Sequence, residues 1–179
     1  VAKENRLLTE EELKNVSFVL GKEYTEARWI KHRLFKVDNG LSIVFKTKNG
    51  QYSEAFAGSG EVAVTSCVVQ IIKAKSGTLV LLDEPEVSLH PGAQERLLTF
   101  LLNMARTRQL QIIFSTHSPH LISSLPDDAI KAFHQLDDGR SVVLPSTHPY
   151  AAFRRLGVTN GSEVRVIVED KLAKSVVQQ

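Results

Sequence analysis

Hydrophobic residues recur every three to four positions in three stretches of the chain, which is the spacing of an amphipathic helix. The first stretch lies behind a capping box formed by Thr9 and Glu12 and predicts a short helix over about residues 10–20. The second begins after "AGSGE" (residues 57–61), and the third covers about residues 92–106. The apolar positions of these two helices are Val64, Cys67, Val68, Ile71, Leu97, Leu98, Leu101 and Leu102. One face of each helix is therefore expected to be buried.

Alternating and continuous apolar runs mark the strands. Residues 28–56 alternate in polarity and contain Asn-Gly pairs at 39–40 and 49–50, which favour two-residue hairpin turns and predict a three-stranded antiparallel meander. "TLVLL" (78–82) and "LQIIFST" (110–116) are continuous apolar runs, typical of parallel strands that are covered on both faces. Because these runs alternate with the helices, the sequence predicts an α/β fold with a parallel sheet flanked by helices.

The last third of the chain predicts smaller elements. "SPHLISSL" (118–125) is typical of a short helix with proline in its first turn. "AIKAFHQL" (129–136) and "RSVVLP" (140–145) flank an Asp-Asp-Gly turn and predict a hairpin. Residues 145–163 indicate a helix and a turn, and "VRVIVED" (164–170) predicts a new strand.

Composition narrows the class of protein. The 179 residues are 42% hydrophobic and 23% charged, as in an ordinary soluble globular protein, and the single cysteine, Cys67, fits a reducing cytoplasm. No apolar run is long enough to span a membrane, so we expect a cytoplasmic protein without a membrane partner. The net charge of +2 is too small to indicate a nucleic-acid partner by itself. The chain starts without methionine and ends in mid-pattern, so it is expected to be a fragment.

Two adjacent acids, Asp83 and Glu84, end the apolar run at 78–82 and precede Pro85. Ligands of open parallel sheets bind outside the carboxyl ends of the strands, and two like charges this close repel unless a cation or a proton lies between them. A Mg²⁺ ion carried by a nucleotide would be a ligand at these strand ends and would offset the repulsion between the two carboxylates. Asp83 would contact the hydrated metal, and Glu84 would orient or deprotonate a water molecule. In the structural alternative, the pair caps the next helix or starts a turn.

Two flanking motifs could serve the same nucleotide. In "AGSGE", small residues at the start of a helix leave backbone N–H groups free to point at a phosphate, although a flexible turn explains the same letters. In "STHS", His117 follows the second buried strand. Its imidazole could donate to a terminal phosphate oxygen or hydrogen-bond a neighbouring loop, and a lone histidine is more often structural.

In combination, these motifs resemble the second half of an ABC-type ATPase core, which has a P-loop NTPase fold. The match covers roughly residues 55–135, with "AGSGE" as the signature motif, "TLVLLDE" as the Walker B strand, "PEVSLHP" as the D-loop region and "STHS" as the switch histidine. "DEPEVSLHP" and "FSTHSPHLI" resemble the DNA-handling branch, which includes RecF, SMC proteins and the OLD nucleases.

The resemblance implies a role for each matching residue. Asp83 would contact Mg²⁺, Glu84 would be the catalytic carboxylate and His117 would sense the γ-phosphate of ATP. The residues that would close over ATP bound by a second copy, in a homo-oligomer of ATPase heads, are Gly58, Ser59, Gly60 and Glu61. The family pattern LSGGQ or LSGGE has serine where this chain has Gly58, which bears on the phosphate contact assigned to Ser59.

A G-x-x-x-x-G-K-[ST] motif occurs nowhere in the 179 residues. The lysine and the backbone cradle for the β- and γ-phosphates are therefore missing, and the chain alone would not bind ATP with ordinary affinity. The phosphate loop is expected either upstream in a longer natural protein or on another chain.

The carboxyl-terminal strand ends in Glu169 and Asp170 and resembles the opening of a Toprim domain. In that resemblance Glu169 binds Mg²⁺ and takes part in phosphodiester cleavage, although a generic strand-to-helix junction explains the letters as well. The expected domains are a helix and meander over residues 1–56, the ATPase core over 57–160 and a truncated Toprim-like start over 161–179.

These observations leave three functional hypotheses. The first is ATP binding and hydrolysis within an OLD-like DNA nuclease, with DNA and a protein of an anti-phage defence system as partners. The second is a nucleotide-gated DNA clamp like RecF or SMC heads, without nuclease activity. The third is a regulatory module that has lost its phosphate loop.

Other reactive side chains are assigned structural roles. Cys67 lies on an apolar helix stripe and is assigned to the core, and Trp29 and Phe35 to the packing of the meander. Arg154 and Arg155 would touch DNA phosphates or lie on a solvated face. The histidines without metal-ligand spacing to a cysteine are His90, His120, His134 and His148.

Overall fold

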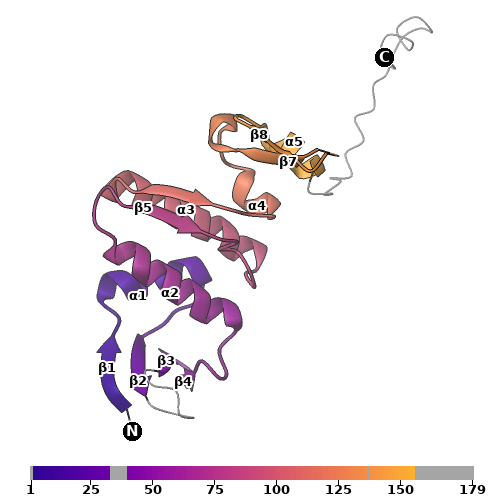
Figure 1. The fold of residues 1–179 in the computed structure, drawn as a ribbon. Helices are drawn as coiled ribbons and strands as arrows, with labels where there is room; N and C mark the ends of the chain where they lie inside the picture. Colours follow the sequence, from indigo (N-terminus) through magenta and orange to yellow (C-terminus); the bar gives the residue numbers. More distant parts are fainter. Residues whose placement is uncertain (1, 33–39, 137, 156–179) are drawn as a thin grey trace, which may run out of the picture. The chain divides into compact units, whose positions relative to one another are not determined.

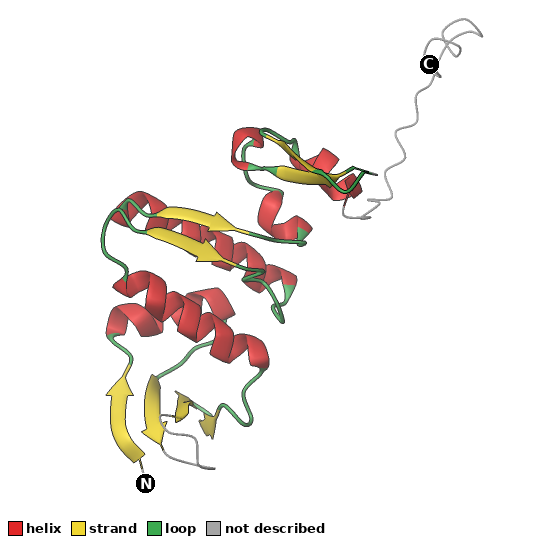
Figure 2. Cartoon of the chain, viewed as in Figure 1, coloured by secondary structure: helices red, strands yellow, loops and turns green. Residues whose placement is uncertain are grey.

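The computed structural model describes residues 2–32, 40–136 and 138–155 (Figure 1). The chain divides into two units, residues 1–125 and 126–179, and each is described by itself. The first unit contains an antiparallel sheet, a parallel strand pair and the helices between them, and the second contains a hairpin and short helices (Figure 2).

The antiparallel sheet has four strands in chain order. They are β1 (Ala2–Leu7), β2 (Glu26–His32), β3 (Gly40–Thr47) and β4 (Gly50–Ser53). β2 to β4 confirm the predicted meander, and β1 adds a fourth strand that the pattern did not predict. β1 has too few apolar residues to alternate in polarity, and it becomes a strand by pairing with β2, where Leu7 lies opposite Arg28.

The turn between β3 and β4 lies at the predicted Asn-Gly pair but is shifted by one residue. Thr47 is the partner of Gly50 across the two strands, so the loop consists of Lys48 and Asn49. Gly50 has a φ of 144°, a dihedral that glycine adopts without the clash of a Cβ atom. The glycine is therefore needed at the first residue of β4 and not inside the turn.

The helices of the first unit begin close to their predicted starts. They are α1 (Glu10–Leu20), α2 (Ser59–Lys73), α3 (Pro91–Arg108) and α4 (Pro119–Ile122). The capping box of α1 is confirmed, because the Thr9 hydroxyl accepts from the Glu12 N–H at 3.3 Å and the Glu12 carboxylate accepts from the Thr9 N–H at 2.9 Å. The Ser118 hydroxyl accepts from the His120 N–H at 3.2 Å and begins α4 in the same way.

The core of the first unit lies between the antiparallel sheet and helices α1, α2 and α3. Val16, Ile43, Phe45, Val68 and Leu97 have no exposed surface. The predicted helix faces are confirmed, with one exception: Leu102 of α3 is 49% exposed. Cys67 is half-buried and packs against this core, and burial raises the pKa of its thiol to about 11, so the thiol stays protonated at neutral pH.

β5 (Leu79–Leu82) and β6 (Gln111–Phe114) are paired in parallel, as predicted. The expectation that both of their faces are covered is wrong for the described residues. Val80, Leu82, Ile112 and Phe114 pack against the core, but the side chains of the other face are exposed. These are Leu79, Leu81 and Ile113, with exposed fractions of 51%, 69% and 61%. The helices therefore cover one face of this strand pair.

The second unit contains the predicted hairpin. β7 (Ala132–Gln135) and β8 (Ser141–Leu144) are antiparallel, a 3₁₀ turn (Asp127–Ala129) precedes them, and α5 (Pro149–Arg155) follows. The predicted strand at residues 164–170, with Glu169, lies outside the described residues, and so does Phe35. Among the described residues, no helix is both long enough and apolar enough to cross a membrane.

Candidate functional site

The carboxyl ends of β5 and β6 place Asp83 beside Ser115. Leu82 and Phe114 are the last paired residues of the two strands, so Asp83 and Ser115 come next on neighbouring strands. The Ser115 hydroxyl donates to Asp83 Oδ1 at 2.5 Å and accepts from the Glu84 N–H at 3.0 Å. One hydroxyl therefore positions both the first carboxylate and the backbone of the second. The sequence analysis assigned no role to Ser115, although the register of two parallel strands could have indicated it.

Glu84 and His117 meet at the same strand ends. The His117 Nε2 atom lies 3.1 Å from Glu84 Oε1, and the two side chains are 76% and 43% exposed. The backbone of Glu84 has a φ of 41°, in the left-handed region that a residue with a Cβ atom seldom adopts. Backbone strain of this kind clusters at functional sites. Here it accompanies a carboxylate that is open to water and in contact with an imidazole.

Glu86 supports this arrangement from below the surface. It is 7% exposed, and its Oε1 atom accepts from the Thr116 hydroxyl at 2.5 Å and from the His117 N–H at 3.1 Å. Its Oε2 atom is buried and has no hydrogen-bond partner among the described residues. Glu86 thus ties the loop after β5 to the loop after β6 and holds the backbone of His117. Sequence analysis missed the role of Glu86, because an acidic residue in a turn is usually interpreted as a solvated residue.

Three other histidines have partners elsewhere. His90 Nδ1 accepts from the Gly92 N–H at 3.3 Å and caps α3, and His120 Nδ1 lies 3.6 Å from Glu95 Oε1. In the second unit, His148 Nδ1 accepts from the Tyr150 N–H at 3.2 Å.

The glycine-rich segment forms the start of α2, with Gly58 as the N-cap residue. Gly58 and Ser59 are exposed, whereas the Glu61 carboxylate accepts four hydrogen bonds from its surroundings. The donors are Lys22 Nζ at 2.9 Å, Tyr24 OH, Tyr52 OH at 2.8 Å and the Gly58 N–H at 3.0 Å. We call Lys22, Tyr24, Tyr52 and Glu61 the Glu61 cluster. Within the described residues, Glu61 therefore serves as an acceptor that anchors the helix.

Hydrogen bonding sets the charge of the Glu61 cluster. Burial alone would raise the pKa of Glu61, but the hydrogen bonds from Lys22, the two tyrosines and Gly58 outweigh it and lower the pKa to about 2. Burial, together with the bond to Glu61, raises the pKa of Tyr24. Burial lowers the pKa of Lys22, but its bonds to Glu61 and Tyr52 outweigh this and raise it. At neutral pH Glu61 is therefore a carboxylate, Lys22 is an ammonium ion and the Tyr24 phenol is neutral.

The start of α2 touches the loop that follows the acids. A Cβ atom built on Gly60 would lie 2.7 Å from the Ser88 carbonyl oxygen and 3.0 Å from Leu89 Cδ2. Only glycine allows the helix and this loop to come so close. Ser88 itself has a φ of 65°. The structure thus joins the two predicted halves of the site, residues 58–61 and residues 83–84, through one loop.

The donors at the strand ends fit one kind of metal ion. Asp83, Glu84 and Ser115 offer carboxylate and hydroxyl oxygens, which are the ligands that Mg²⁺ prefers. Among the described residues, no group of three or more His, Cys, Asp or Glu side chains could hold a metal by itself. Mg²⁺ is usually held by one or two carboxylates together with substrate phosphates and water. This donor set therefore fits Mg²⁺ that arrives with a nucleotide, and does not fit a cage made by the protein alone.

Solved structures of SMC ATPase heads share this fold. One SMC ATPase has a TM-score of 0.57 at 21% sequence identity, and the match covers 83% of this chain and 90% of that one. The Smc head domain of Pyrococcus yayanosii also has a TM-score of 0.57, at 22% identity, over 83% of this chain and 29% of that one.

Two relatives of known class match parts of the sequence. An OLD nuclease of Thermus scotoductus is 42% identical over 69 residues, which is 38% of this chain and 13% of the nuclease. A probable ATPase of retron Vc95 from Vibrio cholerae serotype O1 biovar El Tor is 30% identical over 91 residues, which is 51% of this chain and 16% of that protein. The chain thus spans a small part of the length of both relatives.

The family match, with this fold and these relatives in agreement, shows that the chain is an ATPase domain of the AAA type. The profile of the family described as "AAA domain, putative AbiEii toxin, Type IV TA system" matches residues 30–123, more than half of the 179 residues. The chain belongs to this family.

Proposed function

We propose that these residues form the part of an ATPase head that hydrolyses ATP, with Glu84 as the catalytic carboxylate and His117 as the residue that senses the terminal phosphate. The observation that carries this proposal is the 3.1 Å contact between His117 and Glu84 at the ends of two paired parallel strands. Ligands of parallel sheets bind at such ends. Both side chains are exposed, so a water molecule and a phosphate can reach them.

Glu84 orients the attacking water and accepts its proton, and the His117 imidazole, which lies against this carboxylate, donates its N–H to the terminal phosphate. Glu86 keeps His117 in position by accepting a hydrogen bond from the His117 backbone N–H. Asp83 and Ser115 would hold Mg²⁺, which when bound supplies positive charge at the phosphate oxygens. The hydrogen bond from Ser115 to Asp83 orients the carboxylate towards that role.

In this proposal the phosphate loop, whose G-x-x-x-x-G-K-[ST] motif the 179 residues lack, comes from another part of a longer natural protein or from another chain. Gly58, Ser59 and Gly60 contact the nucleotide of a second head through their backbone, and Glu61 acts by anchoring their helix. Backbone N–H groups at a helix start suit a phosphate. ATP-driven dimerization and DNA-stimulated activation are described for SMC ATPases, and a homo-oligomer that responds to DNA is proposed here by analogy.

The parent protein is proposed to be an OLD-like DNA nuclease of the cytoplasm that acts in defence against phage with a partner protein. The relatives named as an OLD nuclease and a retron ATPase support this branch. In this proposal Glu169 begins a Toprim domain and binds Mg²⁺ for cleavage. The second candidate is a nucleotide-gated DNA clamp without nuclease activity, which the fold of the SMC heads supports.

The ATPase proposal is tested with Glu84→Gln in the natural protein that carries these residues. Turnover of ATP is expected to fall by about 10²-fold or more, since a general base contributes about that factor, while ATP binding persists. Glu95→Gln is the matched control, because Glu95 is also an exposed glutamate near a histidine, 3.6 Å from His120. Phosphate release and nucleotide binding are measured for both variants. Equal turnover in the Glu84 variant and the wild type would refute the role of Glu84.

The nuclease and the clamp are separated by Glu169→Gln in the same protein. The nuclease proposal expects Mg²⁺-dependent cleavage of plasmid DNA that this substitution removes while ATP turnover remains. Wild-type protein that binds DNA in the presence of ATP but leaves it intact would favour the clamp.

A further inference from the structure

A closed path of hydrogen bonds joins the loop after β5, the loop after β6 and the start of α3. The Ser118 N–H donates to the Thr116 hydroxyl at 2.9 Å, and the Thr116 hydroxyl donates to Glu86 Oε1. The Ser118 hydroxyl donates to Gln94 Oε1 at 2.5 Å, and Gln94 Nε2 donates to the Leu89 carbonyl oxygen at 2.9 Å. The Leu89 N–H donates to the Glu86 carbonyl oxygen at 3.0 Å and closes the path. We call Glu86, Gln94, Thr116 and Ser118 the loop network.

Gln94 is suited to the middle of this path, because one side-chain amide offers both an acceptor and a donor. Its oxygen accepts from the loop after β6, and its N–H₂ group donates to the loop after β5. Ser118 is buried, and Gln94 and Thr116 are half-buried. Hydrogen bonds away from water are strong, and a connected network of them rigidifies the segments that it joins. The loop network therefore fixes the spacing between the two loops.

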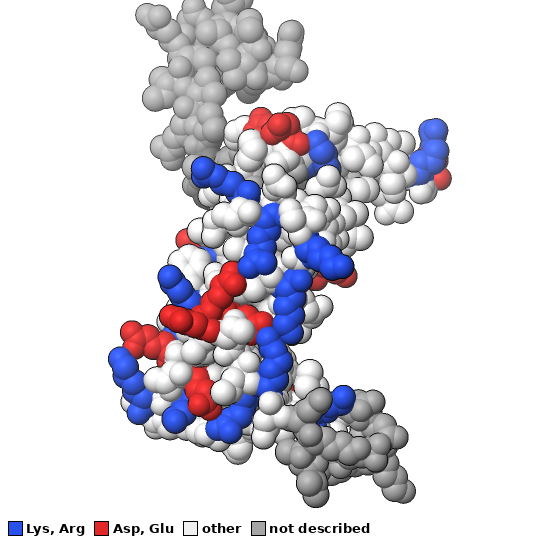
Figure 3. Space-filling view, turned by 90° about the vertical axis from the view of Figure 1, so that its left-hand side faces the viewer, with Lys and Arg blue, Asp and Glu red and all other residues white. Residues whose placement is uncertain are grey.

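Glu86 and Glu12 are the two buried acidic residues of the described part of the chain, and their partners differ. On the surface, acidic side chains lie beside Lys and Arg, as Figure 3 shows for one face. The buried Glu12 likewise accepts from the Arg6 guanidinium, at 2.5 and 2.7 Å. Glu86 has no cationic side chain as a partner among the described residues, and its donors are the Thr116 hydroxyl and the His117 N–H. A buried carboxyl group without a cation costs stability, so its presence indicates a role in fixing geometry.

The loop that carries Glu86 is strained at two positions on either side of it. Glu84 has a φ of 41° and Ser88 has a φ of 65°, both in the left-handed region. Such dihedrals persist only where neighbouring groups hold them. The Glu86 side chain ties the middle of the loop to the loop after β6, and Gln94 holds the carbonyl group that follows Ser88. The loop network thus holds the segment in which Glu84 presents its carboxylate to His117.

We propose that Gln94, Thr116 and Ser118 are positioning residues for ATP hydrolysis, which act through the loop network to keep Glu84 and His117 in contact. Glu84 lies on the loop after β5 and His117 on the loop after β6, so their 3.1 Å contact depends on the spacing of the two loops. A misplacement of about 1 Å at a reacting group can cost about 10²-fold in rate. The inference rests on the proposed role of Glu84 and extends it to the start of α3.

Gln94→Leu and Thr116→Val test the loop network in the natural protein that carries these residues. Each variant keeps the approximate size of the side chain and removes its hydrogen bonds. The kcat of ATP hydrolysis is expected to fall by about tenfold or more, because Glu84 and His117 are misplaced. The KM for ATP should change by less than about twofold, because the nucleotide is still bound. Thr116→Ser keeps the hydroxyl and should retain most of the kcat.

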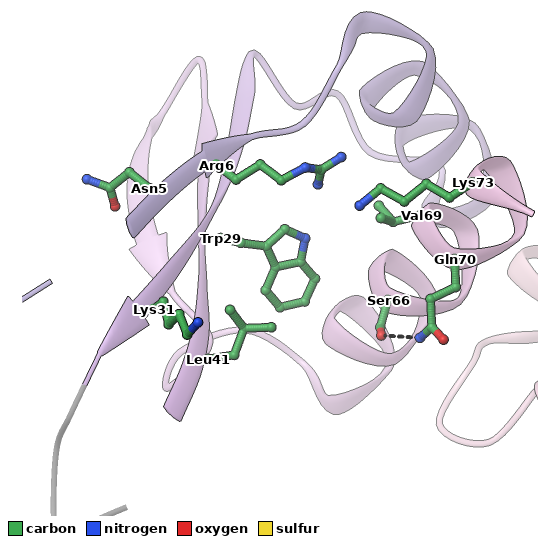
Figure 4. A pocket seen from close by; sticks show the side chains of 9 residues that line it. All are labelled: Asn5, Arg6, Trp29, Lys31, Leu41, Ser66, Val69, Gln70 and Lys73. Atoms are coloured by element: carbon green, nitrogen blue, oxygen red, sulfur yellow. Dashed lines mark hydrogen bonds between the residues drawn. The ribbon is translucent and has the colours of Figure 1, made fainter. Parts of the chain in front are cut away.

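Gln70→Leu is the matched control. The Gln70 amide also bonds a serine, since its Nε2 atom donates to the Ser66 hydroxyl at 3.0 Å. This pair lies on α2 and lines the cavity around Trp29, which packs against the core as predicted (Figure 4). The Gln70 variant should change neither kcat nor KM. Urea unfolding of every variant gives the fraction of folded protein, and kcat is expressed per folded molecule. Gln94→Leu keeps the test valid if Thr116→Val does not fold.

The Glu84→Gln background separates positioning from a merely structural role. Because the loop network acts through Glu84, adding Gln94→Leu there should lower the remaining turnover by less than about twofold, whereas an independent structural effect would repeat the tenfold loss. That repeated loss overturns the proposal. So do network variants that match Gln70→Leu or that raise KM alone. An inactive Glu84→Gln protein with fully active network variants refutes only this inference, whereas wild-type turnover in Glu84→Gln refutes the proposed function and the inference with it.

Discussion

Glu61 and Glu84 both follow a predicted nucleotide-binding motif, and the structure gives them opposite surroundings. The Glu61 side chain is 16% exposed and accepts hydrogen bonds from Lys22, Tyr24, Tyr52 and the Gly58 N–H. The Glu84 side chain is 43% exposed, and its carboxylate contacts only His117 among the described residues. Both were assigned to ATP from the sequence, and only Glu84 keeps its oxygens available.

The difference shows how a carboxylate's partners separate a structural role from a chemical one. A carboxylate with four donors is stabilised as an anion and has little capacity left for a ligand. A carboxylate with one imidazole and open solvent can accept a proton from water or take part in metal binding. The number of donors around each acid is therefore more informative than the motif that it follows.

The largest effect on stability is expected from Glu61→Gln. The amide loses the ion pair with Lys22 and places an N–H₂ group among donors, so the free energy of unfolding should fall by about 2–3 kcal/mol. Glu84→Gln should leave it within about 0.5 kcal/mol, because the side chain is a surface group. Urea denaturation of the chain measures both. Equal losses in the two variants would remove the distinction between the two glutamates.

The pH dependence of folding should also trace to Glu61. Its pKa is about 2 in the folded chain and near 4.5 when unfolded, so its contribution is fully present above pH 4.5 and is lost as pH falls towards 2. A shift of this size corresponds to about 3 kcal/mol at most, and solvent screening of the partly exposed cluster reduces the contribution below that value. Unfolding free energies measured at intervals between pH 5 and 2 should fall less steeply in Glu61→Gln than in the wild type. An unchanged slope would show that other carboxylates carry the acid sensitivity.

Gly60→Ala tests the contact between the start of α2, which contains Glu61, and the loop that follows Glu84. The new methyl group would lie 2.7 Å from the Ser88 backbone oxygen, so the loop or the helix has to shift. The clash costs about 1–3 kcal/mol and is partly offset by the better helix propensity of alanine, so a net loss of about 1–2 kcal/mol is expected. Thermal unfolding with a matched urea series measures it. A variant as stable as the wild type would show that the loop gives way easily.

Local signals predicted much of the fold. The capping box at Thr9 and Glu12, the helical apolar stripes and the hairpin around Gly139 need only nearby residues to be recognised, and each is present. Parallel pairing of the strands before Asp83 and Ser115 also follows from their apolar runs, and it explains why Glu84 and His117 meet.

The rest depends on residues that are distant in the chain. Lys22 and Tyr24 lie 39 and 37 positions before Glu61, and Glu86 reaches Thr116 over 30 positions, so no local pattern reports these contacts. The open face of β5 and β6 was missed for a related reason. A continuous apolar run shows which residues are hydrophobic, but it does not show which segment packs against them.

The smallest expected effect comes from Gly58→Ser, which sharpens the comparison at the N-cap of α2. Gly58 has extended dihedrals, with φ −63° and ψ 145°, and no atom within 4 Å of a Cβ built on it, so serine fits without strain. Its hydroxyl can accept from the Gly60 N–H, since the Glu61 N–H already donates to the Gly58 carbonyl oxygen, and this bond should stabilise the chain by a few tenths of a kcal/mol. Urea denaturation at high precision measures this gain. The Glu61 carboxylate already accepts from the N–H of residue 58, so the new hydroxyl and this carboxylate could stabilise the helix start together. If the hydroxyl caps the helix by itself, the same gain in stability should appear in the Glu61→Gln background, and a gain that disappears there would show that the two groups act together.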